Sequence, residues 1–116
     1  MDYYQIISSN FQATIESIAQ SVDNLAEPIG RASALMVSAL LDDHKIIACG
    51  NGVDAAMAQL FACYLTSRFE HERPALPALA LGTDPAFTTA AGNDYGFEHV
   101  FARQLAGLGK PGDLLV

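Results

Sequence analysis

Residues 45–69 read KIIACGNGVDAAMAQLFACYLTSRF. A short apolar run from Lys45 to Cys49 ends in Gly50-Asn51-Gly52, and a helix-like segment follows at residues 54–69. The pattern predicts a buried strand that leads through a glycine turn into a helix N-terminus, a place suited to an anion. The turn is either a phosphate site or only a tight connection in which Asp54 is the N-cap of the helix. The negative charge of Asp54 opposes a bound phosphate.

The remainder of the chain repeats this alternation of strand and helix. A second strand is predicted at residues 78–81, and Asp84-Pro85 has the pattern of an N-cap followed by proline at the first helical position. That helix should end near Ala91, before a turn at residues 92–96 and a further helix. Leu114 to Val116 read as the opening of a third strand, which would belong to a longer domain. Such alternation predicts an α/β fold with a parallel sheet and helices on both faces.

The N-terminal residues carry a different pattern. Apolar residues recur every three or four positions, which predicts a helix of about six turns; they are Tyr4, Ile7, Phe11, Ile15, Ile18, Val22 and Leu25. Pro28 suits the first turn of a second helix. A narrow apolar stripe usually packs along another helix. We therefore expect an oligomerisation segment at residues 1–43 and the α/β domain at residues 44–116.

Composition restricts the function classes. Of 116 residues, 51% are hydrophobic and 16% charged, with a net charge of −7, which argues against direct nucleic-acid binding. The apolar excess favours a partner subunit. The first ten residues do not resemble a signal peptide, and no apolar run reaches the ~18 residues of a membrane helix, so a cytoplasmic protein is expected. Cys49 and Cys63 are expected to be buried thiols, and the charged residues Glu70, Glu72 and Arg73 a solvated loop edge.

Several motifs taken together resemble one family. CGNG at 49–52, RFEHERPALPALAL at 68–81, GNDYGFEHVFARQ at 92–104 and GKPGDLLV at 109–116 are similar to the sugar isomerase (SIS) domain family. Within it they resemble the phosphoheptose isomerases and the DnaA initiator-associating protein DiaA. The resemblance implies a three-layer, flavodoxin-like fold, of which this chain covers about the first half. It also implies a homotetramer held by the N-terminal helices, with sugar-phosphate sites between subunits.

The resemblance carries over residue by residue. It implies a set of substrate-binding residues: Asn51, Gly52, Arg68, Asn93 and Asp94. In the isomerases the glycine turn continues with a second glycine and a serine, where this chain has Val53 and Asp54. The family's main phosphate-binding loop, rich in serine and threonine, would follow Val116.

The catalytic residues of the isomerases do not carry over. Their helix supplies a histidine and, four residues later, a glutamate for metal binding and proton transfer, where this chain has Leu60 and Tyr64. Isomerisation of an aldose to a ketose needs a positioned base or a metal ion. Between Asp54 and Arg68 the only ionisable side chains are Cys63 and Tyr64, whose ordinary pKa values are ~8.5 and ~10. The resemblance therefore implies no catalytic residue and no zinc ligand in this chain.

The sequence leaves three functions open. The loss of the histidine and glutamate favours a non-catalytic protein of the DiaA type that binds DnaA as a homotetramer and regulates the initiation of chromosome replication. The alternatives are a phosphoheptose isomerase acting on sedoheptulose 7-phosphate and a sugar-phosphate sensor without turnover.

Overall fold

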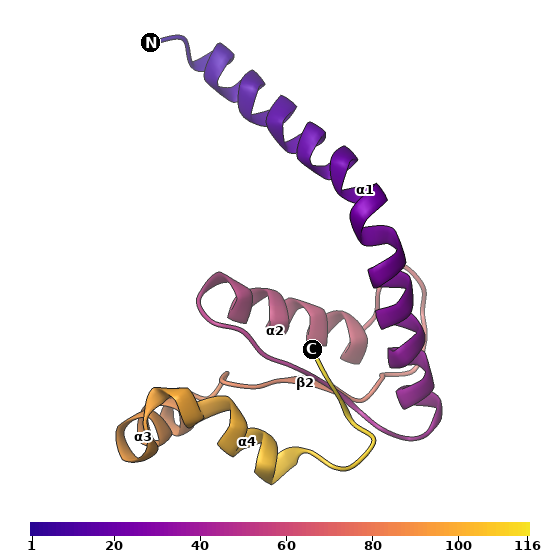
Figure 1. Ribbon diagram of the computed structural model, residues 1–116, viewed down its shortest axis with the longest axis vertical. Helices are drawn as coiled ribbons and strands as arrows, with labels where there is room; N and C mark the ends of the chain where they lie inside the picture. Colours follow the sequence, from indigo (N-terminus) through magenta and orange to yellow (C-terminus); the bar gives the residue numbers. More distant parts are fainter. The chain divides into compact units, whose positions relative to one another are not determined.

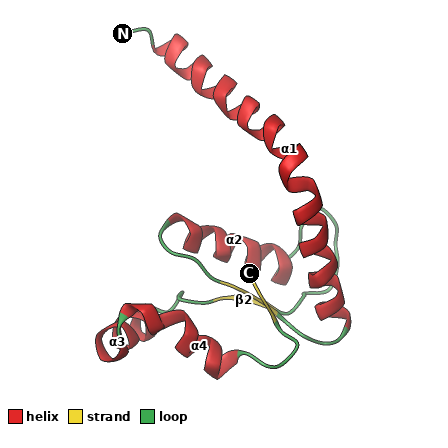
Figure 2. Ribbon diagram, in the orientation of Figure 1, coloured by secondary structure: helices red, strands yellow, loops and turns green.

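The computed structural model describes residues 1–116, which form two compact units, residues 1–35 and 36–116. The strands are β1 (Ile46–Ala48), β2 (Ala78–Ala80) and β3 (Leu114–Leu115). The helices are α1 (Tyr3–Leu41), α2 (Val53–Thr66), α3 (Pro85–Tyr95), the 3₁₀ helix η1 (Phe97–His99) and α4 (Val100–Leu108) (Figures 1 and 2).

The three strands form a parallel sheet in the order β2-β1-β3. Ile46 pairs with Ala78 on one side and with Leu114 on the other. β1 is the central strand, with a neighbour at each edge and helices on both of its faces, and Ile46, Ile47 and Ala48 are all buried. This explains why the strand is apolar at consecutive positions instead of alternating with polar residues.

Helices cover both faces of this sheet. α2 lies on one face, and α3 and α4 lie on the other (Figure 1). On α2 the small residues Ala58 and Ala62 are the buried ones, four positions apart and therefore on one side of the helix. Leu81, directly after β2, and Val100, the first residue of α4, are also buried. The predicted three-layer α/β architecture is confirmed.

The N-terminal residues form one helix, where the sequence predicted two. α1 is 39 residues long, and Pro28 lies inside it. Proline removes one N–H from the helical hydrogen bonds and disfavours the interior of a helix, but it does not always end one. The apolar stripe from Tyr4 to Leu25 is exposed along its whole length, and α1 has no buried residue.

Two other helix boundaries also differ from the prediction. α2 ends at Thr66 instead of residue 69, because the chain then folds back over the helix end. α3 continues through Tyr95 instead of ending near Ala91. Its beginning is confirmed, since the Asp84 carboxylate accepts hydrogen bonds from the Ala86 and Phe87 N–H groups at 2.9 and 3.3 Å.

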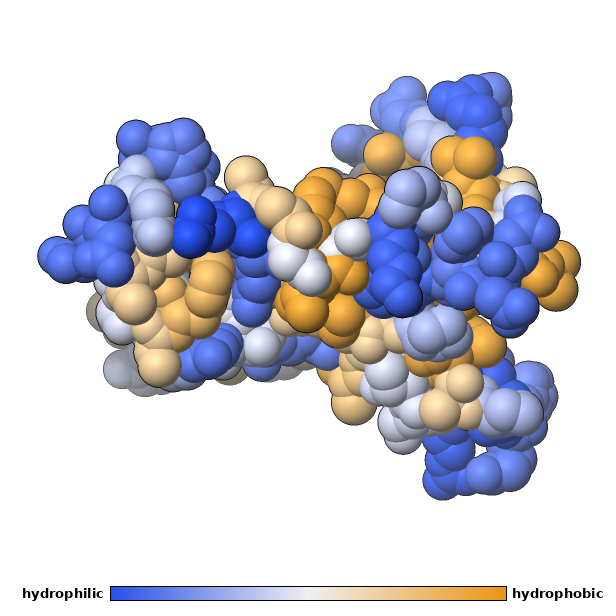
Figure 3. Space-filling model, turned by 90° about the horizontal axis from the view of Figure 1, so that it is seen from below, coloured by the Kyte–Doolittle hydropathy of each residue, from blue (hydrophilic) through white to orange (hydrophobic).

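Large apolar side chains remain at the surface of the chain. Besides the α1 stripe they include Val53 and Met57 on α2, and Figure 3 shows apolar patches between hydrophilic ones on one face. No helix combines the length and the apolar character that crossing a bilayer requires.

Candidate functional site

The glycine turn after β1 is shaped by two glycines with different roles. A Cβ on Gly50 would lie 2.5 Å from the Asp54 carbonyl carbon and 2.6 Å from its oxygen, so the first turn of α2 packs directly on this position. Gly52 has φ of 58° and ψ of −120°, a conformation that strongly favours glycine. Together the two residues let the strand turn directly into the helix.

Asp54 is not the N-cap of α2, the role it would have had in a simple tight connection. Gly52 is the N-cap of α2, and no side chain accepts a hydrogen bond from the first turn. Asp54 lies within that turn, and its own N–H donates to the Asn51 carbonyl at 3.0 Å. The first-turn N–H groups are thus not capped by a side chain, which leaves them able to bind a polar ligand. The carboxylate of Asp54 lies on the same turn and opposes an anion there.

A hollow of about 230 Å³ adjoins this turn, and its lining includes Cys49, Asp54, Phe61 and Val116. The Cys49 N–H donates to the Val116 carbonyl at 3.0 Å, so the ends of β1 and β3 lie side by side. β1 lies between β2 and β3, so the connection after β1 leads to one of its sides and the connection after β2 leads to the other. In open parallel sheets, ligands bind at such a switch point, outside the carboxyl ends of the strands. The Asn51-Gly52 turn lies at this place.

Arg68 lies at the opposite end of α2. Its guanidinium forms an exposed ion pair with Glu72 at 3.1 Å. The 14-residue helix places Arg68 about 20 Å from the Asn51-Gly52 turn, at 1.5 Å per residue. Within one chain, Arg68 and Asn51 therefore do not meet.

Asn93 and Asp94 lie in the last turn of α3 instead of in the predicted loop. The Asn93 amide donates to the Asp94 carboxylate at 3.2 Å. α3 starts where β2 ends, at the same edge of the sheet as the glycine turn (Figure 1). The structure thus places the glycine turn and the beginning of α3 at one edge of the sheet, Asn93 and Asp94 at the other end of α3, and Arg68 beyond the far end of α2.

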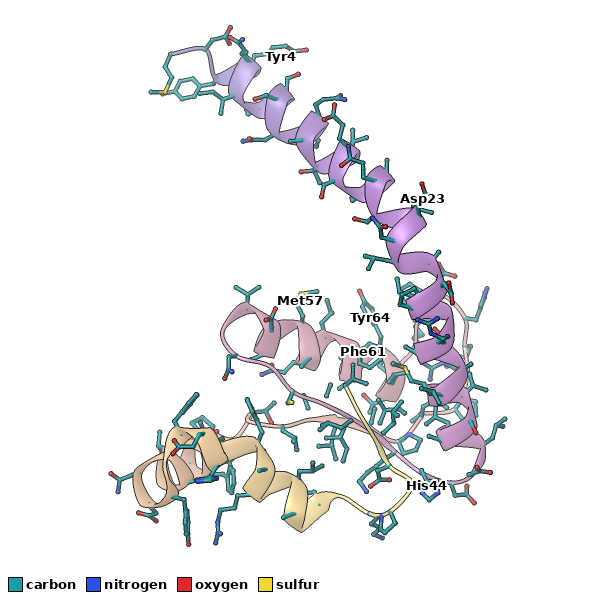
Figure 4. All side chains as sticks on the ribbon, in the orientation of Figure 1. Tyr4, Asp23, His44, Met57, Phe61 and Tyr64 are labelled. Atoms are coloured by element: carbon teal, nitrogen blue, oxygen red, sulfur yellow. The ribbon has the colours of Figure 1, made fainter.

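Leu60 and Tyr64 occupy one side of α2, one helical turn apart, and each is 43% exposed. Met57 and Tyr64 project from the side of the helix that is turned away from the strands (Figure 4). The Phe69 ring contacts the Tyr64 ring edge-on, with 5.0 Å between their centroids. Leucine has no donor atom, and no group of three His, Cys, Asp or Glu side chains is placed to hold a metal ion. Leu60 and Tyr64 therefore do not form a zinc site.

The cysteine prediction is partly wrong. Cys63 is exposed on α2, and Cys49 is half-buried beside the hollow. Arg73, expected to be solvated, instead donates to the carbonyls at the C-terminal end of α2. An arginine a few residues beyond a predicted helix end was the available clue to this role.

Comparison with known proteins decides the family. Residues 10–116 match the model of the SIS domain. The chain belongs to the SIS domain family. The phosphoheptose isomerase of Coxiella burnetii strain RSA 493 is 46% identical over all 116 residues. That of Pseudoalteromonas atlantica is 44% identical over 110 residues, which are 95% of this chain and 56% of that protein.

Two solved structures are similar to nearly the whole of this SIS-domain chain. The phosphoheptose isomerase GmhA from Neisseria gonorrhoeae has a TM-score of 0.86 and 42% identity, covering 97% of this chain and 58% of that one. The phosphoheptose isomerase from Francisella tularensis has a TM-score of 0.90 and 42% identity, covering 99% and 60%. The chain spans 58% of the length of the Coxiella relative.

The prediction of a DiaA-type regulator that binds DnaA is wrong. These relatives and structures are named phosphoheptose isomerases, and nothing in them points to the initiation of replication. The motifs that carried the resemblance therefore identified the family correctly but not its branch. If the protein is an enzyme, its relatives indicate a phosphoheptose isomerase.

Proposed function

We propose that the whole protein is a sugar-phosphate isomerase of the phosphoheptose type, and that this chain supplies part of its substrate site. The observation that carries the proposal is the 46% identity to a phosphoheptose isomerase over the full chain, which includes the strand-turn-helix at Gly50-Asn51-Gly52. The expected substrate is sedoheptulose 7-phosphate, a ketose phosphate. The reaction moves a proton between adjacent carbons, so it needs a base.

The glycine turn is proposed to hold the hydroxyl end of the sugar. The Asn51 side chain and the uncapped N–H groups of α2 offer hydrogen bonds to hydroxyl and carbonyl oxygens. The Asp54 carboxylate, which repels a phosphate, accepts hydrogen bonds from sugar hydroxyls instead. Asn93 and Asp94, at the end of α3, add an amide and a carboxylate of the same kind. The phosphate is then bound elsewhere in the whole protein.

Arg68 is proposed to serve the site of a neighbouring subunit. Its distance of about 20 Å from Asn51 along α2 exceeds the length of a heptose phosphate. A site that uses both residues therefore draws them from two chains. The exposed apolar stripe of α1, from Tyr4 to Leu25, supports such an assembly because apolar surface of this extent usually marks an interface. We propose a homotetramer held by these helices.

The base for the reaction does not come from the outer side of α2 in this proposal. Leu60 carries no ionisable group, and Tyr64 offers only a phenol hydroxyl. The rest of the protein has to supply the base, since this chain spans only 58% of its relative. The same two residues favour a second candidate function, a sugar-phosphate sensor that binds its ligand without turnover.

One experiment separates the two candidates. The purified full-length protein is incubated with sedoheptulose 7-phosphate, and the aldose product is followed over time. Saturable turnover supports the isomerase. A ligand-induced rise in Tm without product supports the sensor. Neither turnover nor a rise in Tm would overturn both.

A further inference from the structure

The C-terminal end of α2 leaves backbone carbonyl groups that need partners. The last turn is partly closed by the Ser67 N–H, which donates to the Cys63 carbonyl at 2.8 Å, and by the Thr66 hydroxyl, which donates to Ala62 at 2.8 Å. Because the helix ends at Thr66, no helical N–H reaches the carbonyls of Tyr64 and Leu65. Their partners come from the chain that follows.

Arg73 donates to both carbonyls, and the Leu76 N–H also donates to the Leu65 carbonyl, at 3.0 Å. Its Nη2 donates to the Tyr64 carbonyl at 2.5 Å, and its Nη1 donates to the Leu65 carbonyl at 2.8 Å. Nη1 also donates to the Pro74 carbonyl at 3.1 Å, so the guanidinium joins the helix to the loop. A positive charge is favourable at the negative end of the helix dipole. The planar guanidinium offers several N–H groups in a fixed fork, which a lysine ammonium cannot reproduce.

The residues between the helix and Arg73 form a tightly turned loop, residues 67–73. The Phe69 ring contacts Tyr64, and the His71 N–H donates to the Phe69 carbonyl at 2.6 Å. Glu70, between them, has φ of 58°, in the left-handed region that a glutamate rarely adopts. Such a conformation persists only where the surroundings hold it. The contacts of Phe69 and Arg73, together with the hydrogen bond from the Leu76 N–H to the Leu65 carbonyl at 3.0 Å, hold the loop on the helix end.

Arg68 is carried by this loop. Its side chain is 65% exposed, and its ion pair is with Glu72, another residue of the loop. The direction of the Arg68 guanidinium therefore depends on the shape of the loop. That shape depends on the anchor at Arg73.

We propose that Arg73 is a positioning residue, which fixes loop 67–73 on the end of α2 and thereby fixes the direction in which Arg68 is presented. The part of this inference that concerns the substrate rests on the proposed function, in which Arg68 binds the sugar phosphate. Arg73 itself acts through Arg68.

The test compares R73K with R103K in the full-length protein. Arg103 lies on α4, where it stacks over Tyr95, and is no part of the proposed site. Hydrogen exchange, followed by mass spectrometry without ligand, should be roughly tenfold faster at residues 64–76 in R73K, as the loss of charge-assisted hydrogen bonds implies. Exchange in the 49–56 turn should stay unchanged, and R103K should leave residues 64–76 unchanged. R73A should show the larger effect of the two Arg73 variants.

A binding measurement completes the test. Affinity for sedoheptulose 7-phosphate should fall in R73K and R68A, and the double variant R68A/R73K should be no weaker than R68A alone. Unchanged exchange at residues 64–76 in R73K and R73A, or losses of affinity that add fully in the double variant, would overturn the role of Arg73. If the wild-type protein binds no sugar phosphate, the proposed function fails, and the exchange measurement still decides whether Arg73 fixes the loop.

Discussion

The Asp113 carboxylate binds the Lys45 ammonium, although the two residues are 68 positions apart in the sequence. The same carboxylate accepts the Lys45 N–H at 3.0 Å and the Lys110 N–H at 2.7 Å. Asp113 thereby ties the turn before β3 to the beginning of β1, and its side chain is only 6% exposed. The hydrogen bond from the Lys45 ammonium, followed by that from the Lys45 N–H, lowers the pKa of Asp113 to about 2.

This contact predicts how stability depends on pH. Because the pKa of Asp113 is lower in the folded protein than the ordinary 3.8, ionised Asp113 stabilises the fold above that value. The stabilisation is lost as the pH falls toward 2. In the full-length protein, D113N should lower Tm at pH 7 and show a smaller loss of Tm between pH 4 and pH 2 than the wild type. The exposed Asp23 offers a control, D23N, which should follow the wild-type curve. Parallel curves for D113N and the wild type would contradict this role.

Gly50 should not tolerate a side chain. A Cβ there would lie 2.5 Å from the Asp54 carbonyl carbon, so α2 has to shift, and G50A should destabilise the protein by about 2 kcal/mol or more. Gly107 is the matched control, since a Cβ there meets nothing within 4 Å. G107A should be neutral or stabilise by up to about 1 kcal/mol. Denaturant unfolding of the full-length variants measures both changes, and equal stabilities would refute the packing described here.

Asp54 should weaken anion binding at the glycine turn. Two unit charges about 4 Å apart repel by about 1 kcal/mol in water and by more in a less polar site. D54S should therefore bind inorganic phosphate at least about fivefold more tightly than the wild type. Calorimetry at low ionic strength measures the affinities, with D42N as the control that should change nothing. No gain in D54S would mean that the turn does not face the anion.

The sequence predicted the sheet and the turn because their patterns are local. The apolar run at residues 46–48 and the glycines after it are sufficient for a strand, a turn and a helix. The prediction of a second helix beginning at Pro28 failed because a proline removes only one hydrogen bond, and the neighbouring turns of α1 persist around it. The N-cap was misplaced because Gly52, with its positive φ, begins α2 without a side-chain cap.

The candidate site was less predictable. Arg68 and Asn51 are both close to α2 in the sequence, but only the straight helix between them sets their separation. The role of Arg73 depends on a chain reversal at Glu70 that no residue pattern announces. Whether the five predicted substrate-binding residues converge would depend on the proposed assembly, which a single chain does not specify.

A mixing experiment tests the shared site. N51A and R68A should each lose affinity for the sugar phosphate as pure full-length proteins. In a randomly mixed assembly, about a quarter of the sites should combine an intact turn from one chain with an intact Arg68 from another. Co-expressed chains should therefore recover a fraction of wild-type sites. If the mixture binds no better than either pure variant, Arg68 does not act across subunits.

The place of the Asn51-Gly52 turn in a sugar-phosphate site is tested by calorimetric titration of the full-length protein with sedoheptulose 7-phosphate. We expect saturable binding that N51A weakens at least about tenfold, the loss expected for a hydrogen bond left unmade in a binding site. Saturable binding that N51A leaves unchanged, or no binding by the wild-type protein, would contradict it.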